Sequence, residues 1–320
     1  MSRAKVSKRS LIYPYLLMAF GFCIPISTAL TNVVLALIVL FWGVDNASDR
    51  FQRWIDVLKT NPVAFMGLVF FLIHIAGVLY TDGNQEKNVE SMMDGAKFLV
   101  ISMMMVYFKD EKFYSAFLLS FLAAMFVTLL LSCFLWLGLL PDLFQAKGRA
   151  SNAVIFHDHI KQNIFMAYTA FVAAMWARKA RHGSLKQWMW GCFSFLALFN
   201  VLFMVTGRTG HLIVLVLSLY YFFTWDRVKS LVAGALILFV LGGFAWFNPL
   251  NPFFLRAQTV VSEVKEWDHK QPADHKSSSG LRLEFLLNSL KIVMENPVFG
   301  TGTGSFATTY REFVGNSGMQ

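Results

Sequence analysis

Four cations stand in short connections between the apolar stretches of this chain. Lys147, Arg149 and Lys161 flank one connection, and Arg208 lies in Thr-Gly-Arg-Thr-Gly-His, residues 206–211. Ammonium and guanidinium groups donate charge-assisted hydrogen bonds to phosphate oxygens. We therefore predict that these four cations bind an anion at a membrane surface, most simply a lipid-linked phosphate or pyrophosphate. The alternative for the lysines is a solvated charge that extends to lipid headgroups.

A fifth cation, Arg282, stands near the start of a predicted amphipathic helix. Apolar residues recur after it with the spacing of one helix face, at Leu283, Leu286, Leu287, Leu290, Val293 and Met294. Serines at 277–279 provide an N-cap and Pro297 a stop, which puts Arg282 in the first turn. Free N–H groups and a guanidinium at one helix end make a phosphate site. The alternative is a surface arginine paired with Glu284.

A glycine-rich segment follows this helix. Gly-Thr-Gly-Thr-Gly, residues 300–304, lacks the lysine of a phosphate-binding loop and the spacing of a dinucleotide fingerprint. It predicts a tight turn with positive φ, in which the N–H groups of Gly302 and Gly304 face the bound anion.

Histidines lie close in sequence to two of the cations. His157 and His159 are good metal ligands, but residues two apart do not share a helix face, and the sequence offers no third ligand. We therefore expect no metal, and we expect hydrogen bonding from these two histidines and from His211.

The elements that must position these residues are membrane helices. Of the 320 residues, 56% are hydrophobic and only 15% are charged, which is too apolar for a solvated surface. A hydrocarbon core about 30 Å thick needs roughly 20 apolar residues per helix. Such stretches recur at residues 11–27, 29–44, 62–80, 92–108, 114–140, 158–177, 187–206, 210–225 and 230–247. We predict an all-α integral membrane protein, a polytopic helical bundle with about nine spans.

Basic residues orient this bundle. More than half of the 28 Lys and Arg residues fall before the first stretch or in the connections on the same side. The positive-inside rule therefore predicts a cytoplasmic N-terminus. We predict two domains, a transmembrane bundle at residues 1–247 and a helical loop domain on the outer, periplasmic face at residues 248–320.

Two segments resemble the O-antigen ligase and polymerase superfamily of bacterial envelopes. One is Gly-Arg-Thr-Gly-His-Leu at residues 207–212, which opens an apolar stretch. The other combines Ser-Gly-Leu-Arg at 279–282, an asparagine-to-proline run at 288–297 and the glycine-rich turn at 300–306. Their order and spacing in a chain with many spans make the resemblance specific.

The resemblance implies a GT-C-like membrane glycosyltransferase with about twelve spans when complete, similar to the lipopolysaccharide O-antigen ligase. Such enzymes transfer glycan from undecaprenyl pyrophosphate to a sugar hydroxyl of lipid A-core, on the periplasmic face of the bacterial inner membrane, with inversion and without a metal. Arg208 and Arg282 match the essential arginine pair of the family. Fixed cations suit this chemistry because negative charge develops on the pyrophosphate leaving group.

The resemblance also implies a general base outside this chain. Family members carry a histidine near the end of the periplasmic loop, followed by further spans. This chain ends at Gln320, about where that motif begins, and His157, His159 and His211 do not match its position. We therefore expect the histidine beyond Gln320 and a loop domain that is incomplete at its C-terminal end.

Other functions stay open at this point. An O-antigen polymerase of the same superfamily uses a second lipid-linked glycan as the acceptor. A transporter predicts ionisable residues deep in several spans, and His74 is the clearest of few; a hydrogen-bonded interhelical histidine explains it as well. A noncatalytic scaffold would not need the outward arginines. The expected partners are the undecaprenyl-pyrophosphate-linked donor, the lipid A-core acceptor and membrane lipids, with no cofactor and no nucleic acid.

Overall fold

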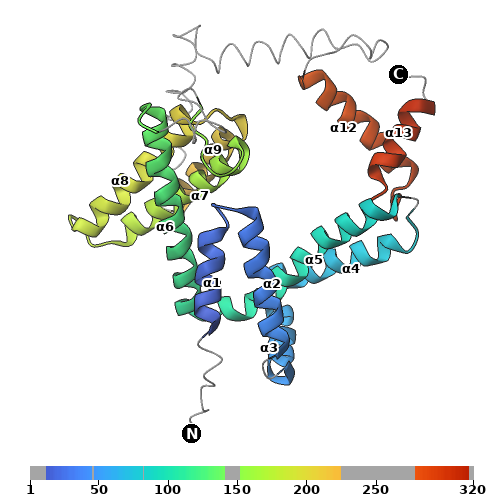
Figure 1. Cartoon of the computed structure of the whole chain (residues 1–320), viewed down its shortest axis with the longest axis horizontal. Helices are drawn as coiled ribbons and strands as arrows, with labels where there is room; N and C mark the ends of the chain where they lie inside the picture. The colour runs from blue at the N-terminus through green and yellow to red at the C-terminus, as the bar shows by residue number, and fades with distance from the viewer. Residues whose placement is uncertain (1–11, 45–46, 82, 141–151, 225–277, 317–320) are drawn as a thin grey trace. The chain divides into compact units, whose positions relative to one another are not determined.

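The computed structural model describes residues 12–44, 47–81, 83–140, 152–224 and 278–316 (Figure 1). These residues form helices and contain no β-strand, which confirms the predicted helical class. The chain divides into two compact units, each made of two segments that are distant in sequence. Unit 1 comprises residues 1–47 and 107–238, and unit 2 comprises residues 48–106 and 239–320.

Unit 1 is built on two helix pairs, one parallel and one antiparallel. Its helices are α1 (Ile12–Cys23), α2 (Thr28–Val44), α6 (Glu111–Trp136), α7 (His159–Lys179), α8 (Leu185–Phe199), the π-helical segment η3 (Asn200–Met204) and α9 (Arg208–Phe223). α1 packs along α6, and α7 packs along α8. Gly183 allows the tight turn between α7 and α8 by adopting a φ of 73°. The Ser184 side chain then caps α8 by accepting a hydrogen bond from the Gln187 N–H.

The core of unit 1 lies between α6, α7 and α8. Met125 of α6 and Met166 of α7 are fully buried there, beside the small residues Ala170 and Ala197. Small side chains let helix backbones approach closely, which is the usual packing of helices in lipid.

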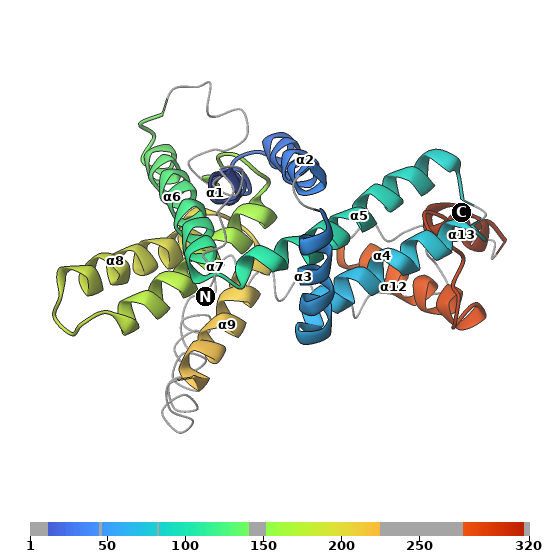
Figure 2. The ribbon, with the colours of Figure 1, turned by 90° about the horizontal axis from the view of Figure 1, so that it is seen from below.

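Unit 2 contains a hairpin of two helices joined to a second helix pair. Its helices are α3 (Ala47–Thr60), α4 (Pro62–Val78), most of α5 (Gln85–Phe108), α12 (Ser278–Glu295) and α13 (Phe306–Asn316). α4 begins with Pro62 after Asn61, whose side chain accepts bonds from two N–H groups of the first turn. α4 and α5 then run side by side in opposite directions (Figure 2), with Gly95 of α5 directly against the His74 ring.

α3 is a helix that the sequence analysis did not predict. The helix is amphipathic, with charged side chains on one face and apolar side chains on the other, and Val57 is buried. The Trp54 indole N–H donates to Ser102 Oγ (3.1 Å), and Ser102 Oγ donates to the Ala64 carbonyl (2.7 Å). These bonds tie α3 to both arms of the α4–α5 hairpin.

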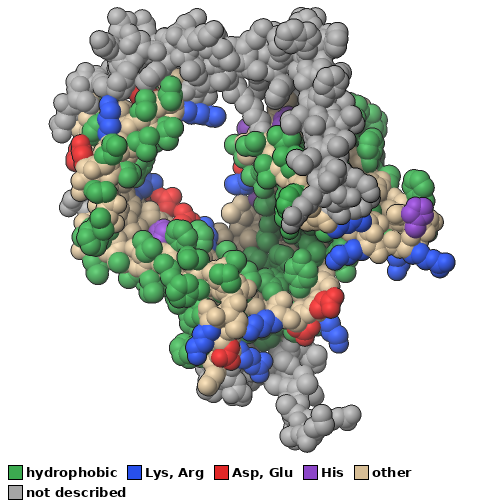
Figure 3. All heavy atoms as spheres, turned by 180° about the vertical axis from the view of Figure 1, so that it is seen from behind, with side chains coloured by type: hydrophobic (Ala, Val, Ile, Leu, Met, Phe, Trp, Pro, Cys, Tyr) green, Lys and Arg blue, Asp and Glu red, His purple; other side chains and the backbone are tan. Residues whose placement is uncertain are grey.

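Several helices fit a membrane. In the described part of the chain, α5, α6 and Leu185–Met204 are long and apolar enough to cross one. Phe51–Thr60 and Pro62–Val78 pass the same test together but are bent by 106°, as in a broken span or a re-entrant loop, and α1, α2 and α9 are shorter apolar helices. Hydrophobic side chains make up much of the surface seen in Figure 3. The chain is therefore a helical membrane protein.

The predicted apolar stretches up to residue 225 all coincide with helices of the structure. The ninth stretch, residues 230–247, lies outside the described residues, and so does the predicted domain boundary at 247/248. The count of nine spans is not confirmed. α7 is not among the long apolar helices, because it carries polar side chains such as Gln162, Asn163 and Thr169.

A turn that we call the glycine turn, residues 299–305, docks on the end of the hairpin. The Thr303 N–H donates to the Gly77 carbonyl (3.0 Å) and Thr303 Oγ1 donates to the His74 carbonyl (2.8 Å). In return, Thr81 Oγ1 donates to the Thr303 carbonyl (2.9 Å). Three hydrogen bonds on one residue join segments that lie more than 200 positions apart in the chain.

The glycines make this docking possible. Gly302 has a φ of 92°, and a Cβ there would lie 2.5 Å from Thr81 Cα. Gly304 has a φ of 82°, and a Cβ there would lie 2.8 Å from the Asn88 N atom. The predicted turn with positive φ is thus confirmed, but both glycines face the hairpin backbone.

We predict that Gly302→Ala separates the glycine turn from the hairpin, since the conformation alone costs about 1–3 kcal/mol and the Cβ also meets backbone atoms. Gly300→Ala is the matched control, because Gly300 has a φ of 64° with nothing within 4 Å of its Cβ position. Thermal unfolding of the purified protein in detergent should show a clearly larger loss for Gly302→Ala. Equal losses would mean that the docking adds no stability.

Candidate functional site

Arg208 lies in a turn that connects two helices of unit 1. α8 continues into the π-helical segment η3, and α9 begins at Arg208. Between them, the Thr206 N–H donates to Asn152 Oδ1 (3.0 Å). Single π-helical turns often occur at functional sites because they re-aim the residues that follow. We call residues 206–211 the arginine turn.

The arginine turn ends in a free helix N-terminus. The N-cap is Gly207, and no side chain of the described residues caps α9. The first N–H groups of a helix have no intrahelical partner, and the helix dipole makes this end positive. His211 uses Nδ1 to bond the Gly207 carbonyl (2.7 Å) within the same turn, and its role at the site stays a prediction. The combination predicted for Arg282, an arginine at a helix start, therefore occurs at Arg208, whose side chain lies outside the described part of the structure.

The two glycines of the arginine turn lie against α7. A Cβ on Gly207 would be 2.6 Å from Asn163 Nδ2, and a Cβ on Gly210 would be 2.7 Å from Asn163 Cβ and 3.0 Å from Val201 Cγ1. Glycines beside an arginine can let a ligand approach the backbone closely. The structure gives them a different role, which is to let α9 start directly beside Asn163 and η3.

Asn163 is a buried polar residue that the sequence analysis did not single out. Its side chain is 0% exposed, and neither Oδ1 nor Nδ2 has a hydrogen-bond partner among the described residues. A buried amide group without a partner costs about 1–3 kcal/mol per unpaired group. A hydrogen-bond partner from outside the described residues would offset this cost. Such a partner would lie beside the arginine turn.

A chain of buried hydrogen bonds holds the segment that faces the arginine turn. Asn200 Nδ2 donates to Ser132 Oγ (2.7 Å), and Ser132 Oγ donates to the Ala153 carbonyl (2.7 Å). Gln162 Nε2 donates to the same carbonyl (3.1 Å), while Gln162 Oε1 accepts from the Ile155 N–H (2.9 Å). Hydrogen bonds are stronger in the low-dielectric interior than in water, so this network favours one conformation of the chain. Residues 152–158 are thereby held in place.

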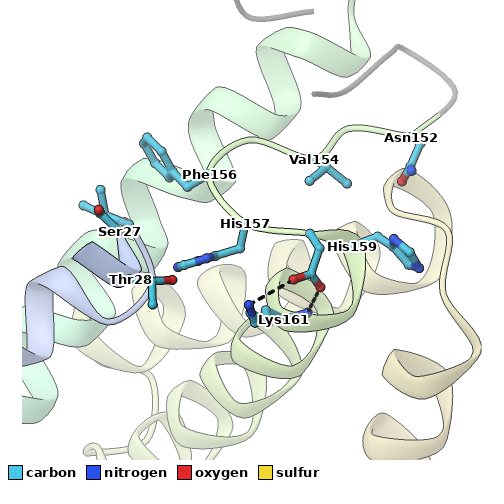
Figure 4. Close-up of a pocket in the computed structure, with 10 residues that line it drawn as sticks. Ser27, Thr28, Asn152, Val154, Phe156, His157, His159 and Lys161 are labelled. Atoms are coloured by element: carbon cyan, nitrogen blue, oxygen red, sulfur yellow. Dashed lines mark hydrogen bonds and ion pairs between the residues drawn. The ribbon is translucent and has the colours of Figure 1, made fainter. Parts of the chain in front are cut away.

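This segment lines a cavity of about 590 Å³ in unit 1 (Figure 4). The opposite wall is the turn between α1 and α2. The lining residues are Ile26, Ser27, Thr28, Asn152, Val154, Phe156, His157, Asp158, His159 and Lys161. The volume is within the range of small-molecule sites, and the lining mixes hydroxyl, amide, imidazole and carboxylate groups with one aromatic ring.

The two histidines of the cavity point to opposite sides. In Figure 4 the His157 ring points toward Ser27 and Thr28, and its Nε2 lies 3.1 Å from the Ile24 carbonyl. The His159 ring points the other way, and its Cδ2 lies 3.6 Å from a Cβ position on Gly207. No group of three metal-ligating side chains occurs within the described ranges. His157 therefore contacts the Ile24 carbonyl, His159 lies beside the arginine turn, and the role of either histidine at the site stays a prediction.

Lys161 is paired in this structure. Its Nζ lies 3.3 Å from Asp158 Oδ2, and the Asp158 side chain also caps α7 by accepting from the Ile160 and Lys161 N–H groups. The hydrogen bond from the Lys161 N–H is the main cause that lowers the pKa of the Asp158 carboxyl, which stays ionised at neutral pH. An anion at Lys161 would have to compete with this carboxylate. Binding of pyrophosphate by Lys161 stays a prediction.

Arg282 belongs to unit 2. α12 begins at Ser278, so Arg282 follows the first turn, and the prediction that it lies within that turn was wrong by about one residue. The serines at 278–279 fall inside the helix, which starts earlier than the apolar pattern indicated. Arg282 is exposed and forms no ion pair with Glu284 or with any other residue that the structure describes. The alternative reading of a surface ion pair is thus not supported.

α12 packs on α13 with a face different from the predicted leucine face. The Phe285 and Tyr310 rings stack with centroids 4.3 Å apart, and buried Asn288 donates to the Tyr310 hydroxyl (3.3 Å). Ile292 completes this contact. The leucine face remains largely exposed.

The structure thus brings together part of the predicted site. His157, His159 and Lys161 line one cavity, and the arginine turn lies beside His159. Lys147 and Arg149 lie outside the described residues. Arg208 and Arg282 belong to different units, so their convergence on one ligand stays a prediction, as does a role for the Gly302 and Gly304 N–H groups.

Asn152, Asn163, Ser27 and Thr28 are the residues that sequence reasoning missed. The one available signal was Gln162-Asn163 inside a predicted span, since polar side chains within a span usually have a function.

We predict that Gly210→Ala lowers stability by about 1–3 kcal/mol, since its Cβ would force α9 away from Asn163. Gly191→Ala in α8 is the matched control, because a Cβ there meets nothing within 4 Å and alanine favours the helix. The midpoint of thermal unfolding in detergent should fall for the first variant and stay level or rise for the second. A Gly210→Ala protein as stable as wild type would contradict the described contact.

Part of the chain is similar to a known protein family. Residues 193–319 match the family model described as O-antigen ligase, whereas no curated protein and no solved structure matches the chain. Both arginines and the glycine turn lie inside the matched region. This match confirms the resemblance stated from the motifs: residues 193–319 are similar to the O-antigen ligase family.

Proposed function

We propose that this protein is a membrane glycosyltransferase that attaches O-antigen polysaccharide to lipid A-core. The donor is undecaprenyl-pyrophosphate-linked glycan, the acceptor is a sugar hydroxyl, and the reaction takes place on the periplasmic face of the bacterial inner membrane. The observation that carries the proposal is the position of Arg208 as first residue of α9, an uncapped helix start within the matched region 193–319.

The chemistry of the arginine turn suits a pyrophosphate. Departure of the glycan leaves negative charge on the pyrophosphate, and fixed donors stabilise this charge as it forms. The N–H groups at the start of α9 are such donors, and we assign the guanidinium of Arg208, the first residue of this helix, to the same role. Arg282 supplies a second guanidinium, which is exposed and has no ion-pair partner among the described residues.

The cavity beside the arginine turn suits a sugar. Its hydroxyl, amide and imidazole groups can bond sugar hydroxyls, and the Phe156 ring offers an apolar wall. The Lys161–Asp158 pair leaves little net charge there. We assign the cavity to a sugar adjacent to the pyrophosphate and the arginine turn to the pyrophosphate itself. Inversion at the transferred carbon completes the proposal.

The alternative of an O-antigen polymerase rests on the same family match, since the family covers both activities. The transporter alternative loses its clearest support. His74 Nδ1 bonds the Phe70 carbonyl (2.7 Å), and its ring packs on Phe98 and Gly95 of α5. A packed, hydrogen-bonded histidine needs no role in transport.

A strain without the gene should lose long glycan on lipid A-core while long lipid-linked chains accumulate. The measurement is a lipopolysaccharide ladder read together with the lipid-linked pool. Accumulation of single lipid-linked repeat units would instead identify a polymerase. An unchanged ladder would contradict both activities.

Arg208→Ala and Arg282→Ala should each reduce glycan transfer by about 10²–10³-fold, since each removes a fixed donor to the leaving group. Arg208→Lys and Arg282→Lys keep the charge but lose the two-pronged geometry, so they should retain part of the activity. Arg311→Ala, an exposed arginine of α13, is the matched control and should transfer normally. Complementation of the deletion strain, normalised to the protein in the membrane fraction, measures this. Full activity of either alanine variant would remove that arginine from the site.

A further inference from the structure

The glycine turn is fixed at one end of a hairpin that lies in the membrane. The Thr303 N–H bonds the Gly77 carbonyl (3.0 Å), and the Tyr80 hydroxyl donates to the Phe299 carbonyl (2.5 Å). The Tyr80 and Phe299 rings also meet edge to face, with centroids 6.3 Å apart. These contacts fix the position of the Val298–Phe299 segment at the end of the hairpin.

The hairpin in turn places this segment relative to the membrane surface. α5 is one of the helices that can cross a membrane, and α4 has no charged side chain. Large apolar side chains are exposed along α4, as on a lipid-facing helix: Val63, Phe65, Met66, Phe70, Leu72 and Ile73. α4 ends at Val78, after which Leu79 is 84% exposed. The exposed charges of Asp94 and Lys97 on α5 stand beside Gly95, which contacts His74 one turn before the end of α4, so the membrane surface lies close to this end.

Apolar side chains continue from this point onto α12. Val298 is 81% exposed and Phe299 is 77% exposed, next to Leu79 and Tyr80. On α12, large apolar side chains are exposed at helical spacing at Leu286, Leu290, Val293 and Met294. In Figure 1, α12 runs across the direction of the hairpin rather than along it.

The remaining faces of α12 have other neighbours. Phe285, Asn288 and Ile292 face α13, and Glu284 and Glu295 lie on a third, polar side. A helix with an apolar stripe, a polar side and an orientation across a membrane hairpin is the pattern of a helix that lies in the interfacial layer. The apolar stripe is followed by exposed Val298 and Phe299, and Phe299 contacts Tyr80 at the end of α4.

We propose that the Val298–Phe299 turn and the exposed stripe of α12 rest on the lipid surface, in the headgroup layer at the end of the α4–α5 hairpin. Tyr80 then stands where interfacial aromatic residues concentrate. Arg282 is four residues before Leu286 and so lies at the edge of the stripe, from which its guanidinium reaches lipid phosphates. The lipid surface thereby holds Arg282 at the depth of a lipid-linked phosphate. This inference requires the membrane assignment of α4 and α5, and not glycan transfer.

Spin labels test the depth of α12 directly. The three native cysteines, Cys23, Cys133 and Cys192, are first replaced by serine. Single cysteines are then introduced by Leu290→Cys, Met294→Cys and Val298→Cys on the stripe, and by Glu284→Cys and Glu295→Cys on the polar side as matched controls. The full chain is labelled with a nitroxide in vesicles of phosphatidylethanolamine and phosphatidylglycerol. Collision rates are measured with oxygen, which enters lipid, and with a water-soluble nickel chelate.

The stripe labels should collide more with oxygen than with nickel, and the two controls should show the reverse ratio. Nickel access at all five positions would place the stripe in water and overturn the proposal. Protection from both reagents at 290, 294 and 298 would mean that protein covers the stripe, either a second copy or another part of the chain, and would overturn it equally. Because the readout is collision rate, a protein without glycan transfer still gives a valid result.

Discussion

The close contact between Asn163 and the backbone of Gly207 and Gly210 is the constraint on which the candidate site depends. A side chain on either glycine would fill the space that Asn163 occupies, so α9 could not begin beside α7. The helix start, with its unpaired N–H groups and Arg208 as first residue, is therefore held at a fixed place. The buried network through Ser132 and Gln162 holds the facing segment, so that a polar cavity remains open beside the turn.

Unit 2 uses glycines in the same way for a different purpose. Gly302 and Gly304 allow the glycine turn to reach backbone atoms of the hairpin end, and Thr303 closes the contact with hydrogen bonds. α12, which carries Arg282, is connected directly to this turn. In unit 1, Arg208 stands between two glycines that contact α7, whereas in unit 2, Arg282 lies near the start of α12 and the glycine turn follows the other end of that helix. Fixed donors are what stabilisation of a departing pyrophosphate requires.

Sequence reasoning recovered the features that depend on local pattern. Continuous apolar stretches predicted the helices, because a backbone in lipid must satisfy its own hydrogen bonds. The need for positive φ at Gly302 and Gly304 was also predicted, because glycine adopts that conformation without strain. The family domain followed from the order of short motifs around Arg208 and Arg282.

Features that depend on contacts between distant segments were missed or misjudged. α3 is polar overall and was not predicted, although Trp54 anchors it to Ser102 of α5. The described part of α12 starts at Ser278, so Arg282 follows the first turn instead of lying within it, and Ser277 lies outside the described residues. The partner of Gly207 is Asn163, 44 positions away, and no local pattern reveals which side chain a glycine faces.

The most direct test of the account is transfer by the purified protein in proteoliposomes supplied with the lipid-linked glycan and lipid A-core. The account predicts one undecaprenyl pyrophosphate released for each glycan attached to lipid A-core, and loss of both products when Arg208 is replaced by alanine. Growth of the lipid-linked glycan without attachment, or attachment that does not depend on Arg208, would contradict it.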